Sequence, residues 1–485
     1  MSERKVIVIG SGLGGLTSAL LLAQRGFDVT VLEQSAQPGG CLQCFRRGEA
    51  KFETGMHFIG SAAEGQTLDR LLGMLGVRQD IRLQQLDTQG YDVVALEGEL
   101  FPFANGREAF ISTLARRFPH QQRQLEQYFD LIKEVSADSS LRSIGSTSPT
   151  IMPGAKYQLL SIDQVVESVI TDPLLQRVLV GNLPLYAGEL GHTPFATHAF
   201  ITDFYNQSAF RVVGGSDAIA RSLVGSIRSL GGRVVTNCRV ESIVTDSEKA
   251  TGVTIQGGDF LPADIIISDT HPMRTLELTR SNLIRPAFRN RINAMRQTVG
   301  CFALYLDFKP QTVAYMNHNF YGYTGHTPWD CEKYLPSDWP RGFLYMHFAS
   351  ELQQQWAKTG VVLTYMRWDD VAQWSNTTVG RRGQAYEDFK QQKAGVLMEA
   401  VEKFFPGLGS HVSRCYTSTP LTYRDYTGTE GGSMYGVARD AIHPEACRVS
   451  HRLRIPNVYQ TGQNINSHGI LGTIIGSLIT CGELR

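Results

Sequence analysis

Three glycines and one acid near the start of the chain have the spacing of a nucleotide-binding loop. Gly10, Gly12 and Gly15 form the pattern G-x-G-x-x-G, and Glu33 follows about 20 residues later. In such a loop the first glycine permits a tight turn, the second lets a pyrophosphate approach the backbone, and the third lets a helix pack on a strand. The acid accepts hydrogen bonds from ribose hydroxyls. These residues predict binding of a dinucleotide; the alternative is a helix start that merely packs closely on its strand.

The segments around these residues have the patterns that the loop requires. Residues 5–10, KVIVIG, are typical of a first strand that is buried on both faces of a parallel sheet. Residues 16–26, LTSALLLAQRG, predict an apolar helix that ends at its glycine, and residues 28–34, DVTVLEQ, predict the second strand. The amides at the start of such a helix face the phosphates of a bound nucleotide.

A second glycine pair, Gly39 and Gly40, follows shortly after Glu33. Glycines let the backbone come close to a ligand. A second close approach suits a long, enclosed FAD better than an NAD(P) held at one crossing point of the sheet, so the pair favours FAD. Beside it, Cys41 and Cys44 form C-x-x-C, a pattern typical of a redox dithiol. No thioredoxin-like pattern surrounds these cysteines, which disfavours that role.

The stretch FETGMHFIG, residues 52–60, places an acid, a glycine and a histidine close behind the loop. His57 can serve as a general acid toward a reduced substrate, because histidine titrates near working pH. It can equally hold a cofactor ring in place by hydrogen bonding. The residue types leave both roles open.

These motifs together resemble a known group of flavoproteins. Residues 6–40 resemble the FAD-binding start of the amine oxidase and phytoene desaturase superfamily, and GGC followed by FETGMHFIG resembles, within that group, the branch of retinol saturases and carotenoid isomerases. Residues 423–436, YRDYTGTEGGSMYG, and residues 455–484 resemble the closing segments of the same branch. Some relatives have proline where His468 stands here. The resemblance is specific at both ends of the chain and over residues 211–270, and it covers the remainder only in outline.

The resemblance implies a set of residues around a non-covalently bound FAD. Met56, His57 and Phe58 would run along the isoalloxazine ring, and the backbone around Val240 would hold the adenine edge. His57, Tyr435 or a water molecule would supply the proton in catalysis. The implied cofactor-binding residues are Gly10, Ser11, Gly12, Gly14, Gly15, Glu33, Gln34, Gly40, Cys41, Met56, His57, Phe58, Val240, Gly462, Gln463, Gly469, Ile470 and Leu471.

The same resemblance implies an α/β fold in two interleaved parts. One part is a Rossmann-like FAD-binding domain of the GR2 type, and the other is an α+β substrate domain, as in amine oxidases. We assign residues 1–85, 206–285 and 416–485 to the discontinuous FAD-binding domain, and residues 86–205 and 286–415 to the substrate-binding domain. In the last of these segments the runs CFALYLDF, NFYGYTG and FLYMHFAS predict sheet strands, and their aromatic, alternating side chains form core or cover a flat, apolar ligand.

Residues 211–243 are predicted to return the chain to the nucleotide domain. They begin with a glycine pair, continue as an amphipathic helix and end in a β-rich segment. Ile219, Leu223, Ile227 and Leu230 form the apolar stripe of this helix.

Composition excludes several other classes of protein. A chain of 485 residues, 42% hydrophobic and 19% charged, is typical of a globular enzyme with more than one domain. Lys+Arg and Asp+Glu both total 46, so no net positive field favours nucleic acid. The eight cysteines fit reduced thiols, and no metal-ligand spacing indicates a metal site. The N-terminus lacks a secretory signal and no apolar run is long enough to cross a membrane, so we expect a cytoplasmic protein, with peripheral attachment to a membrane surface left open.

The expected function is reduction of one carbon–carbon double bond in a hydrophobic conjugated polyene, such as a carotenoid or retinoid, by hydride transfer from flavin N5. No second G-x-G-x-x-G follows a strand elsewhere, so the electron donor would be an external NAD(P)H or a redox partner protein. The polyene would arrive free or on a carrier protein. Desaturation and cis–trans isomerisation of a polyene are the alternatives on the same scaffold; amine oxidation and non-catalytic binding of flavin and polyene rank below them.

Overall fold

The first strand, β1 (Lys5–Ile9), lies in the middle of a five-stranded parallel sheet. The computed structural model describes residues 4–137 and 153–484. The strand order is β10-β2-β1-β14-β20, and every neighbouring pair is parallel. The other four strands are β2 (Asp28–Leu32), β10 (Arg233–Val235), β14 (Ile265–Ser268) and β20 (Val458–Gln460). Segments from the start, middle and end of the chain therefore build one sheet.

Helices cover one face of this sheet, and a small antiparallel sheet with two short helices covers the other. In β1, Val6 and Val8 face the helical layer, whereas Ile7 and Ile9 face the opposite layer. The helical layer consists of α1 (Leu13–Ala23), α8 (Asp217–Ser229) and α13 (Gly469–Gly482). The opposite layer consists of β11 (Val240–Thr245), β12 (Ala250–Ile255), β13 (Phe260–Pro262), α9 (Pro272–Leu278) and α10 (Pro286–Asn293).

Most of the apolar stripe that was predicted for the helix in residues 211–243 is confirmed in α8. Ile219, Leu223 and Ile227 are fully buried against the sheet, whereas Leu230 is 48% exposed. Leu230 lies outside the stripe because α8 ends at Ser229 and the backbone leaves the helical conformation at the next residue.

A seven-stranded mixed sheet forms the centre of the second part. Its order is β19-β15-β18-β17-β16-β7-β8, with one parallel pair between β7 and β16. The strands are β7 (Asp92–Leu96), β8 (Glu99–Phe103), β15 (Gly300–Phe308), β16 (Asn319–Tyr323), β17 (Gly342–His347), β18 (Thr359–Met366) and β19 (Val412–Ser418). The predicted strands CFALYLDF, NFYGYTG and FLYMHFAS correspond to β15, β16 and β17.

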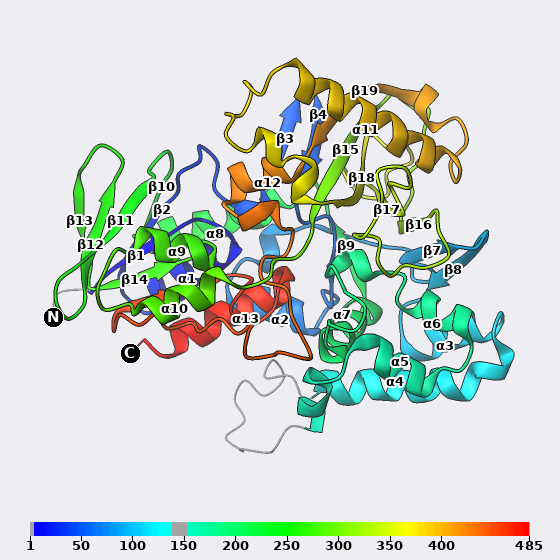
Figure 1. Cartoon of the computed structure of the whole chain (residues 1–485), viewed down its shortest axis with the longest axis horizontal. Helices are drawn as coiled ribbons and strands as arrows, with labels where there is room; N and C mark the ends of the chain where they lie inside the picture. The colour runs from blue at the N-terminus through cyan, green and yellow to red at the C-terminus, as the bar shows by residue number, and fades with distance from the viewer. Residues whose placement is uncertain (1–3, 138–152, 485) are drawn as a thin grey trace.

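Side chains alternate across this sheet between two hydrophobic clusters. Tyr305 of β15 packs toward the helices of residues 107–207, whereas Leu304 and Leu306 pack toward the helices at the opposite face. Figure 1 shows the first group of helices below the sheet and α11 above it. The first group is α3 (Arg107–Ala115), α4 (Gln122–Ala137), α5 (Ile162–Val169), α6 (Pro173–Leu179) and α7 (Phe195–Gln207); the opposite face carries α11 (Gln384–Glu402) and α12 (Pro420–Thr427).

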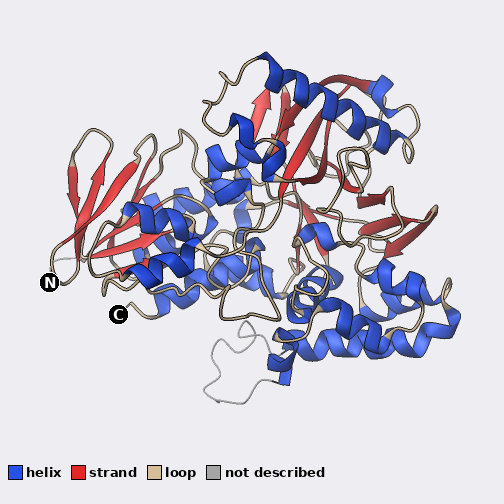
Figure 2. Cartoon of the chain, in the orientation of Figure 1, coloured by secondary structure: helices blue, strands red, loops and turns tan. Residues whose placement is uncertain are grey.

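Two small sheets join the parts. The stretch FETGMHFIG begins in one of them, at the end of β4, and finishes in the other, in β5. Figure 1 labels β3 and β4 beside β15, and Figure 2 shows that strands and helices occur together in both parts of the chain. The small sheets are β3 (Cys44–Arg47) with β4 (Ala50–Glu53), and β5 (Ile59–Gly60) with β9 (Ala209–Val212) and β6 (Leu83–Gln85); α2 (Thr67–Met74) lies between β5 and β6 in the chain.

The layered α/β architecture confirms the predicted fold class. All strands of the five-stranded sheet fall within the segments assigned to the FAD-binding domain. Two elements run across proposed boundaries: α7 passes through 205/206 and β19 passes through 415/416. The division into domains itself stays a prediction. Figure 1 shows both chain ends on the side of the five-stranded sheet, where α13 packs against α1.

Candidate active site

A cavity of about 350 Å³ extends from the nucleotide-binding loop to the seven-stranded sheet. This volume is in the range of cofactor and ligand pockets. Its wall includes residues from both ends of the chain and from the middle. The predicted site residues in its wall are Gly10, Ser11, Gly12, Gly14, Glu33, Gln34, Gly40, Cys41, Met56, His57, Phe58, Val240, Tyr435, Gly462, Gln463, Gly469 and Ile470. Their individual roles toward a ligand stay predictions.

Gly15 and Leu471 do not line the cavity. A Cβ atom on Gly15 would lie 2.2 Å from the carbonyl oxygen of Gly10, so this glycine serves the close contact between α1 and β1. Leu471 is half-buried in the first turn of α13, one residue beyond Ile470. Because successive helical residues differ by about 100° in direction, Ile470 faces the cavity and Leu471 faces away.

The glycine loop brings backbone, rather than side chains, to the cavity. Gly10 has a φ of +94° and Gly40 a φ of +54°, conformations that side chains rarely adopt. A Cβ atom on Gly40 would lie 3.1 Å from the Cα atom of Gly12. Gly12 begins α1 without any side-chain cap, and no acidic residue lies in the first turn of the helix. The start of α1 therefore presents positive backbone dipoles at the cavity.

Glu33 follows β2 and is 8% exposed. One carboxylate oxygen accepts hydrogen bonds from the amide and the hydroxyl of Ser11, at 3.0 and 2.6 Å, and the other accepts one from the amide of Ser35 at 2.8 Å. A carboxylate offers about four acceptor positions, so capacity remains for a hydroxyl donor in the cavity.

The C-terminal segment forms the opposite wall of the loop region. β20 ends before Gly462, and a Cβ atom on Gly14 would lie 2.7 Å from the backbone nitrogen and Cα of Gly462. α13 then begins at Gly469, again with no side-chain cap. Two helix starts, one from each end of the chain, thus lie at one cavity, and neither N-cap residue caps its own helix with a side chain.

His57 lies in the turn that joins β4 to β5 and is 7% exposed. Its Nδ1 atom lies 3.6 Å from an oxygen of the buried Glu53, and its Nε2 atom is buried without a hydrogen-bond partner. Glu53 is fixed by the amide of Ser216, which donates to the other carboxylate oxygen at 3.0 Å. The buried guanidinium of Arg211 donates to the backbone carbonyl of His57 at 3.4 Å. One side of the ring thus lies beside Glu53, and Nε2 is an unpartnered atom of a residue that lines the cavity.

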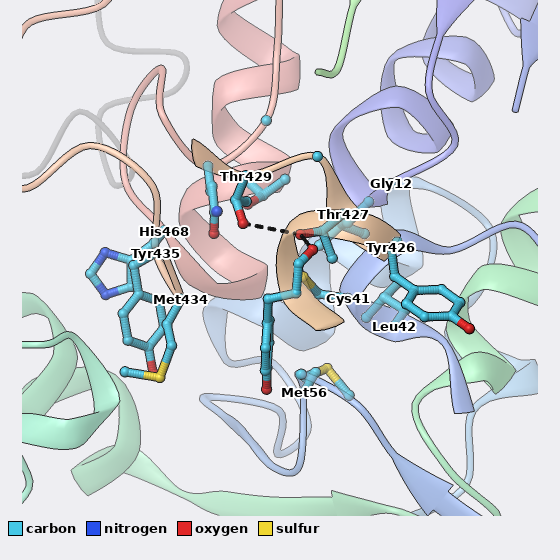
Figure 3. Close-up of a pocket in the computed structure, with 18 of the residues that line it drawn as sticks. Gly12, Cys41, Leu42, Met56, Tyr426, Thr427, Thr429, Met434, Tyr435 and His468 are labelled. Carbon is cyan, nitrogen blue, oxygen red and sulfur yellow. Dashed lines mark hydrogen bonds between the residues drawn. The ribbon is translucent and has the colours of Figure 1, made fainter. Parts of the chain in front are cut away.

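Tyr435 and His468 form one side of the cavity (Figure 3), with ring centroids 4.6 Å apart. The Tyr435 hydroxyl donates to the carbonyl of Pro184 at 2.9 Å, and burial raises its pKa well above the usual value. Burial lowers the pKa of His468 to about 3, and the nearby Arg439 adds to this, so His468 is neutral. In Figure 3 these rings face Gly12, Cys41 and other residues across the cavity.

The C-x-x-C pair is not a disulfide. Cys41 lines the cavity, whereas the Sγ atom of Cys44 lies 3.5 Å from the hydroxyl of Ser216. Burial raises the pKa of Cys41 to about 11, and burial next to Glu53 raises that of Cys44 to about 12. Reactive thiols have a lowered pKa, so neither cysteine has the properties of a redox dithiol.

Thiol titration checks this arrangement. All eight cysteines of the chain are free, so protein denatured without reductant is expected to titrate eight thiols, as many as protein that was reduced beforehand. A deficit of two thiols in the unreduced sample would contradict the assignment.

At the seven-stranded sheet the cavity wall becomes apolar and aromatic. Most of these side chains are buried, and of the described residues that line this end, none carries a charge. Tyr365 has a buried hydroxyl without a partner, whereas the hydroxyl of Tyr323 donates to the carbonyl of Gly181 at 2.6 Å. The main contributors are Pro184, Leu185, Tyr205, Tyr323, Phe343, Leu344, Leu363, Tyr365 and Met434.

Comparison with known families decides the class of protein. The family model described as flavin containing amine oxidoreductase matches residues 13–478, nearly the whole chain. The chain belongs to the flavin-containing amine oxidoreductase family. It is therefore an FAD-dependent oxidoreductase, and the resemblance drawn from its sequence motifs is confirmed.

Within this family, two curated relatives are similar to this flavin oxidoreductase over nearly its whole length. It is 28% identical to the all-trans-retinol 13,14-reductase of Rattus norvegicus, over 98% of this chain and 84% of the relative. It is 22% identical to the lycopene-forming phytoene desaturase of a Paracoccus species, over 98% of this chain and 96% of the relative. Among solved structures, an oxidoreductase from Methanosarcina mazei superposes with a TM-score of 0.68 at 16% identity, over 99% of this chain and 100% of that one, and shares the fold.

The cavity of this flavin oxidoreductase fits FAD. Two helix starts suit anionic and carbonyl groups of a cofactor. The glycines let backbone segments pack closely beside the cavity, because a Cβ atom on Gly12, Gly14 or Gly40 would lie within 3.1 Å of other protein atoms. Glu33 stands at the end of β2, where the ribose of the family's cofactor would be held. The residues of the glycine loop, Val240, Met56 to Phe58 and the start of α13 would hold the cofactor.

Asp269 is a cavity residue that the motifs did not single out. It follows β14, the strand next to β1 in the sheet, and its carboxylate lies among the glycines of the loop. Ligands of open parallel sheets bind at the carboxyl ends of neighbouring strands. The position directly after the strand at 265–268 was therefore the signal that could have identified it.

Two further features of the flavin oxidoreductase concern membranes and metals. No helix among the described residues is long and apolar enough to cross a membrane. Over the same ranges, 4–137 and 153–484, no three His, Cys, Asp or Glu side chains gather in a way that could hold a metal ion.

Proposed function

We propose that this flavoenzyme reduces one carbon–carbon double bond of a hydrophobic conjugated polyene, with His57 as the proton donor. The observation that carries the proposal is the continuity of the cavity. It joins the flavin-binding loop to an end lined by aromatic and aliphatic side chains of the seven-stranded sheet. A flat, apolar ligand buried there would lie in direct reach of the cofactor.

The charge distribution along the cavity supports an uncharged substrate. The charged wall residues, Glu33, Arg239, Asp269 and Arg274, all belong to the nucleotide end. A protonated amine at the apolar end would meet no carboxylate among the described wall residues there, and burying an unpaired charge is costly. This argues for a polyene over an amine. The rat relative is named for reduction of all-trans-retinol and the Paracoccus relative for desaturation of phytoene, which are both hydrophobic polyenes.

FAD, when bound, supplies the hydride at N5. The chain's own residues position the polyene and exclude water. Phe58 and Tyr205 pack with ring centroids 4.8 Å apart at the junction of the two ends. A dry cavity prevents loss of the hydride to solvent and strengthens electrostatic interactions within it.

His57 is suited to deliver the proton from Nε2. That atom is free and buried in a residue of the cavity wall, whereas Nδ1 faces Glu53 at 3.6 Å. The carboxylate of Glu53 lies beside Nδ1, which leaves Nε2 as the nitrogen available to the substrate. The imidazolium can then release its Nε2 proton to the substrate carbon and remain neutral, with its other proton directed at Glu53.

Reducing equivalents would come from an external NAD(P)H or a redox partner protein, and the polyene would enter free or from a carrier. Peripheral contact with a membrane would give access to a substrate dissolved in lipid. These parts of the proposal rest on the chemistry of the substrate.

The test is anaerobic mixing of photoreduced, FAD-loaded enzyme with all-trans-retinol and with carotenoids. The proposal expects reoxidation of the flavin and a product that is heavier by two hydrogens, with a shortened conjugated system. A product of unchanged mass with a shifted spectrum would indicate isomerisation instead of reduction. A product that has lost two hydrogens and is formed only by the oxidised enzyme would indicate desaturation instead. Tight binding of a polyene without any change in flavin redox state would indicate a non-catalytic binding protein.

Tyr435 is expected to contribute little as a proton donor. Its hydroxyl is occupied by the carbonyl of Pro184, and its raised pKa makes release of the proton unfavourable. Tyr435→Phe is therefore expected to lower the rate of flavin reoxidation by polyene less than about tenfold, below the contribution of a general acid. If the rate fell as much as it does in a His57 variant, Tyr435 would be the proton donor instead.

A further inference from the structure

Asp269 occupies the place where the positive end of helix α1 meets the cavity. It directly follows β14, and its carboxylate lies beside the backbone of Gly12 and Gly15, whose amides favour its ionised form. A Cβ atom on Gly12 would lie 2.5 Å from one carboxylate oxygen, and Cβ atoms on Gly14 and Gly462 would lie 2.5 and 2.6 Å from the other. The side chain thus fills the space between the glycine loop and the C-terminal segment.

Amides at the start of this helix are the groups that hold the pyrophosphate of a dinucleotide. In this protein an acid of the chain already lies beside two of them. An ionised Asp269 and a pyrophosphate would be two anions at one helix end, inside a cavity where charges are weakly screened. A neutral carboxylic acid would instead offer an O–H donor to a phosphate oxygen.

The surrounding charges do not neutralise an ionised Asp269. Glu33, after β2, is a second acid close to it, and the thiol of Cys41 faces it from the loop after Gly40. Among the described residues no salt bridge to Asp269 is present, and Arg274 is paired with Glu277 at 2.6 Å. Burial lowers the pKa of His271, which keeps that cavity residue neutral. The remaining basic residues of the wall are Arg239, His57 and His468, and burial lowers the pKa of His468 to about 3.

We propose that Asp269 must be a neutral acid for FAD to bind, so that uptake of one FAD is coupled to uptake of one proton. The coupling rests on FAD being the cofactor and not on reduction of a polyene. It makes Asp269 a residue that sets cofactor affinity as a function of pH.

The sign of the effect follows from the surroundings of Asp269. Burial and the charge of Glu33 raise its pKa to about 7 in the protein without cofactor. The negative charges of a bound pyrophosphate raise this pKa further. Below about pH 7 the acid is protonated in both states and the affinity is constant. Above that pH the free protein loses the proton and the complex keeps it, so the affinity for FAD falls as pH rises, by about tenfold per pH unit.

The experiment measures FAD binding to flavin-free, full-length protein by quenching of flavin fluorescence, from about pH 6 to about pH 9. Wild type is expected to lose affinity over the upper part of this range. Asp269→Asn keeps the size and a donor but cannot ionise, so its affinity is expected to be independent of pH. Asp259→Asn removes an exposed acid that does not line the cavity, so it is the matched control and is expected to keep the slope of the wild type.

Three results would overturn the proposal: a wild-type affinity that does not change with pH, an Asp269→Asn variant with the slope of the wild type, or no FAD binding at any pH. The last result would also remove the cofactor assignment, whereas the first two would leave it and the proposed reduction intact. Circular dichroism controls for folding of the variants. If Asp269→Asn does not fold, calorimetry of FAD binding to the wild type at about pH 8, in buffers of different ionisation enthalpy, still reports whether about one proton is taken up.

Discussion

Replacement of Gly15 by alanine is expected to yield a protein that is strongly destabilised and does not retain flavin. A Cβ atom at this position would lie 2.2 Å from the carbonyl oxygen of Gly10, and this oxygen belongs to the backbone directly after β1. The backbone cannot move away without separating α1 from the central strand. We expect a loss of about 3 kcal/mol in the free energy of unfolding, and a loss of FAD affinity of at least about a hundredfold, because the helix start is displaced from the cavity. Chemical denaturation and FAD titration measure the two effects.

Gly225→Ala is the matched control for this prediction. Gly225 lies within α8 and is exposed, and nothing approaches within 4 Å of the position of its Cβ atom. Alanine there is expected to stabilise the protein by up to about 1 kcal/mol, since it is the better helix former, and to leave FAD binding unchanged. If Gly15→Ala behaved like Gly225→Ala, the close contact between helix and strand would not be needed for cofactor binding.

Replacement of His57 by glutamine is expected to abolish most polyene reduction while leaving the flavin in place. Glutamine keeps hydrogen-bonding capacity near Glu53 but cannot deliver a proton. General acid catalysis contributes roughly a hundredfold to ten-thousandfold, so the rate of flavin reoxidation by polyene should fall by that factor. Rapid mixing of photoreduced enzyme with polyene measures it, and the absorbance spectrum of bound flavin shows whether the cofactor site is intact.

The size of this loss separates two roles of His57. If His57 only positioned the cofactor ring, the substitution would alter the flavin spectrum and the FAD affinity, and the reoxidation rate would fall by much less. His326→Gln serves as control, because that side chain is 90% exposed and does not line the cavity. If His57→Gln kept a reoxidation rate within about threefold of the wild type, the proton donor would have to be a water molecule or another residue.

The parts of the fold that were predictable from the sequence are those set by local rules. The glycine spacing, the acid after the second strand and the apolar helix between them fix one βαβ unit, because each residue type has a single purpose in it. Alternation of side chains in the aromatic strands was similarly sufficient to place β15, β16 and β17. Their residues Tyr323, Phe343 and Leu344 reach the cavity, whereas others form core, and alternation alone cannot tell these apart.

The features that were missed depend on contacts between distant segments. Asp269 gained its position from the order of strands in the sheet, which places the end of β14 beside the loop after β1. The orientation of Leu471 depends on which side of α13 faces the cavity, and this is set by packing against α1. Leu230 kept the helical spacing of its neighbours but lies beyond the last turn of α8, because helix ends are decided within one or two residues by capping. Arg211, which supports His57 from behind, is a buried charge that no pattern in its own segment indicates.

Titration of the flavin-free protein with FAD, followed by all-trans-retinol or a carotenoid, tests whether cofactor and polyene share one cavity. We expect one FAD per chain to restore the flavin absorbance, and the polyene then to shift that absorbance by entering the apolar end of the same cavity. Protein that is folded by circular dichroism but takes up no FAD, or that binds FAD and leaves its spectrum unchanged with every polyene, would contradict this expectation.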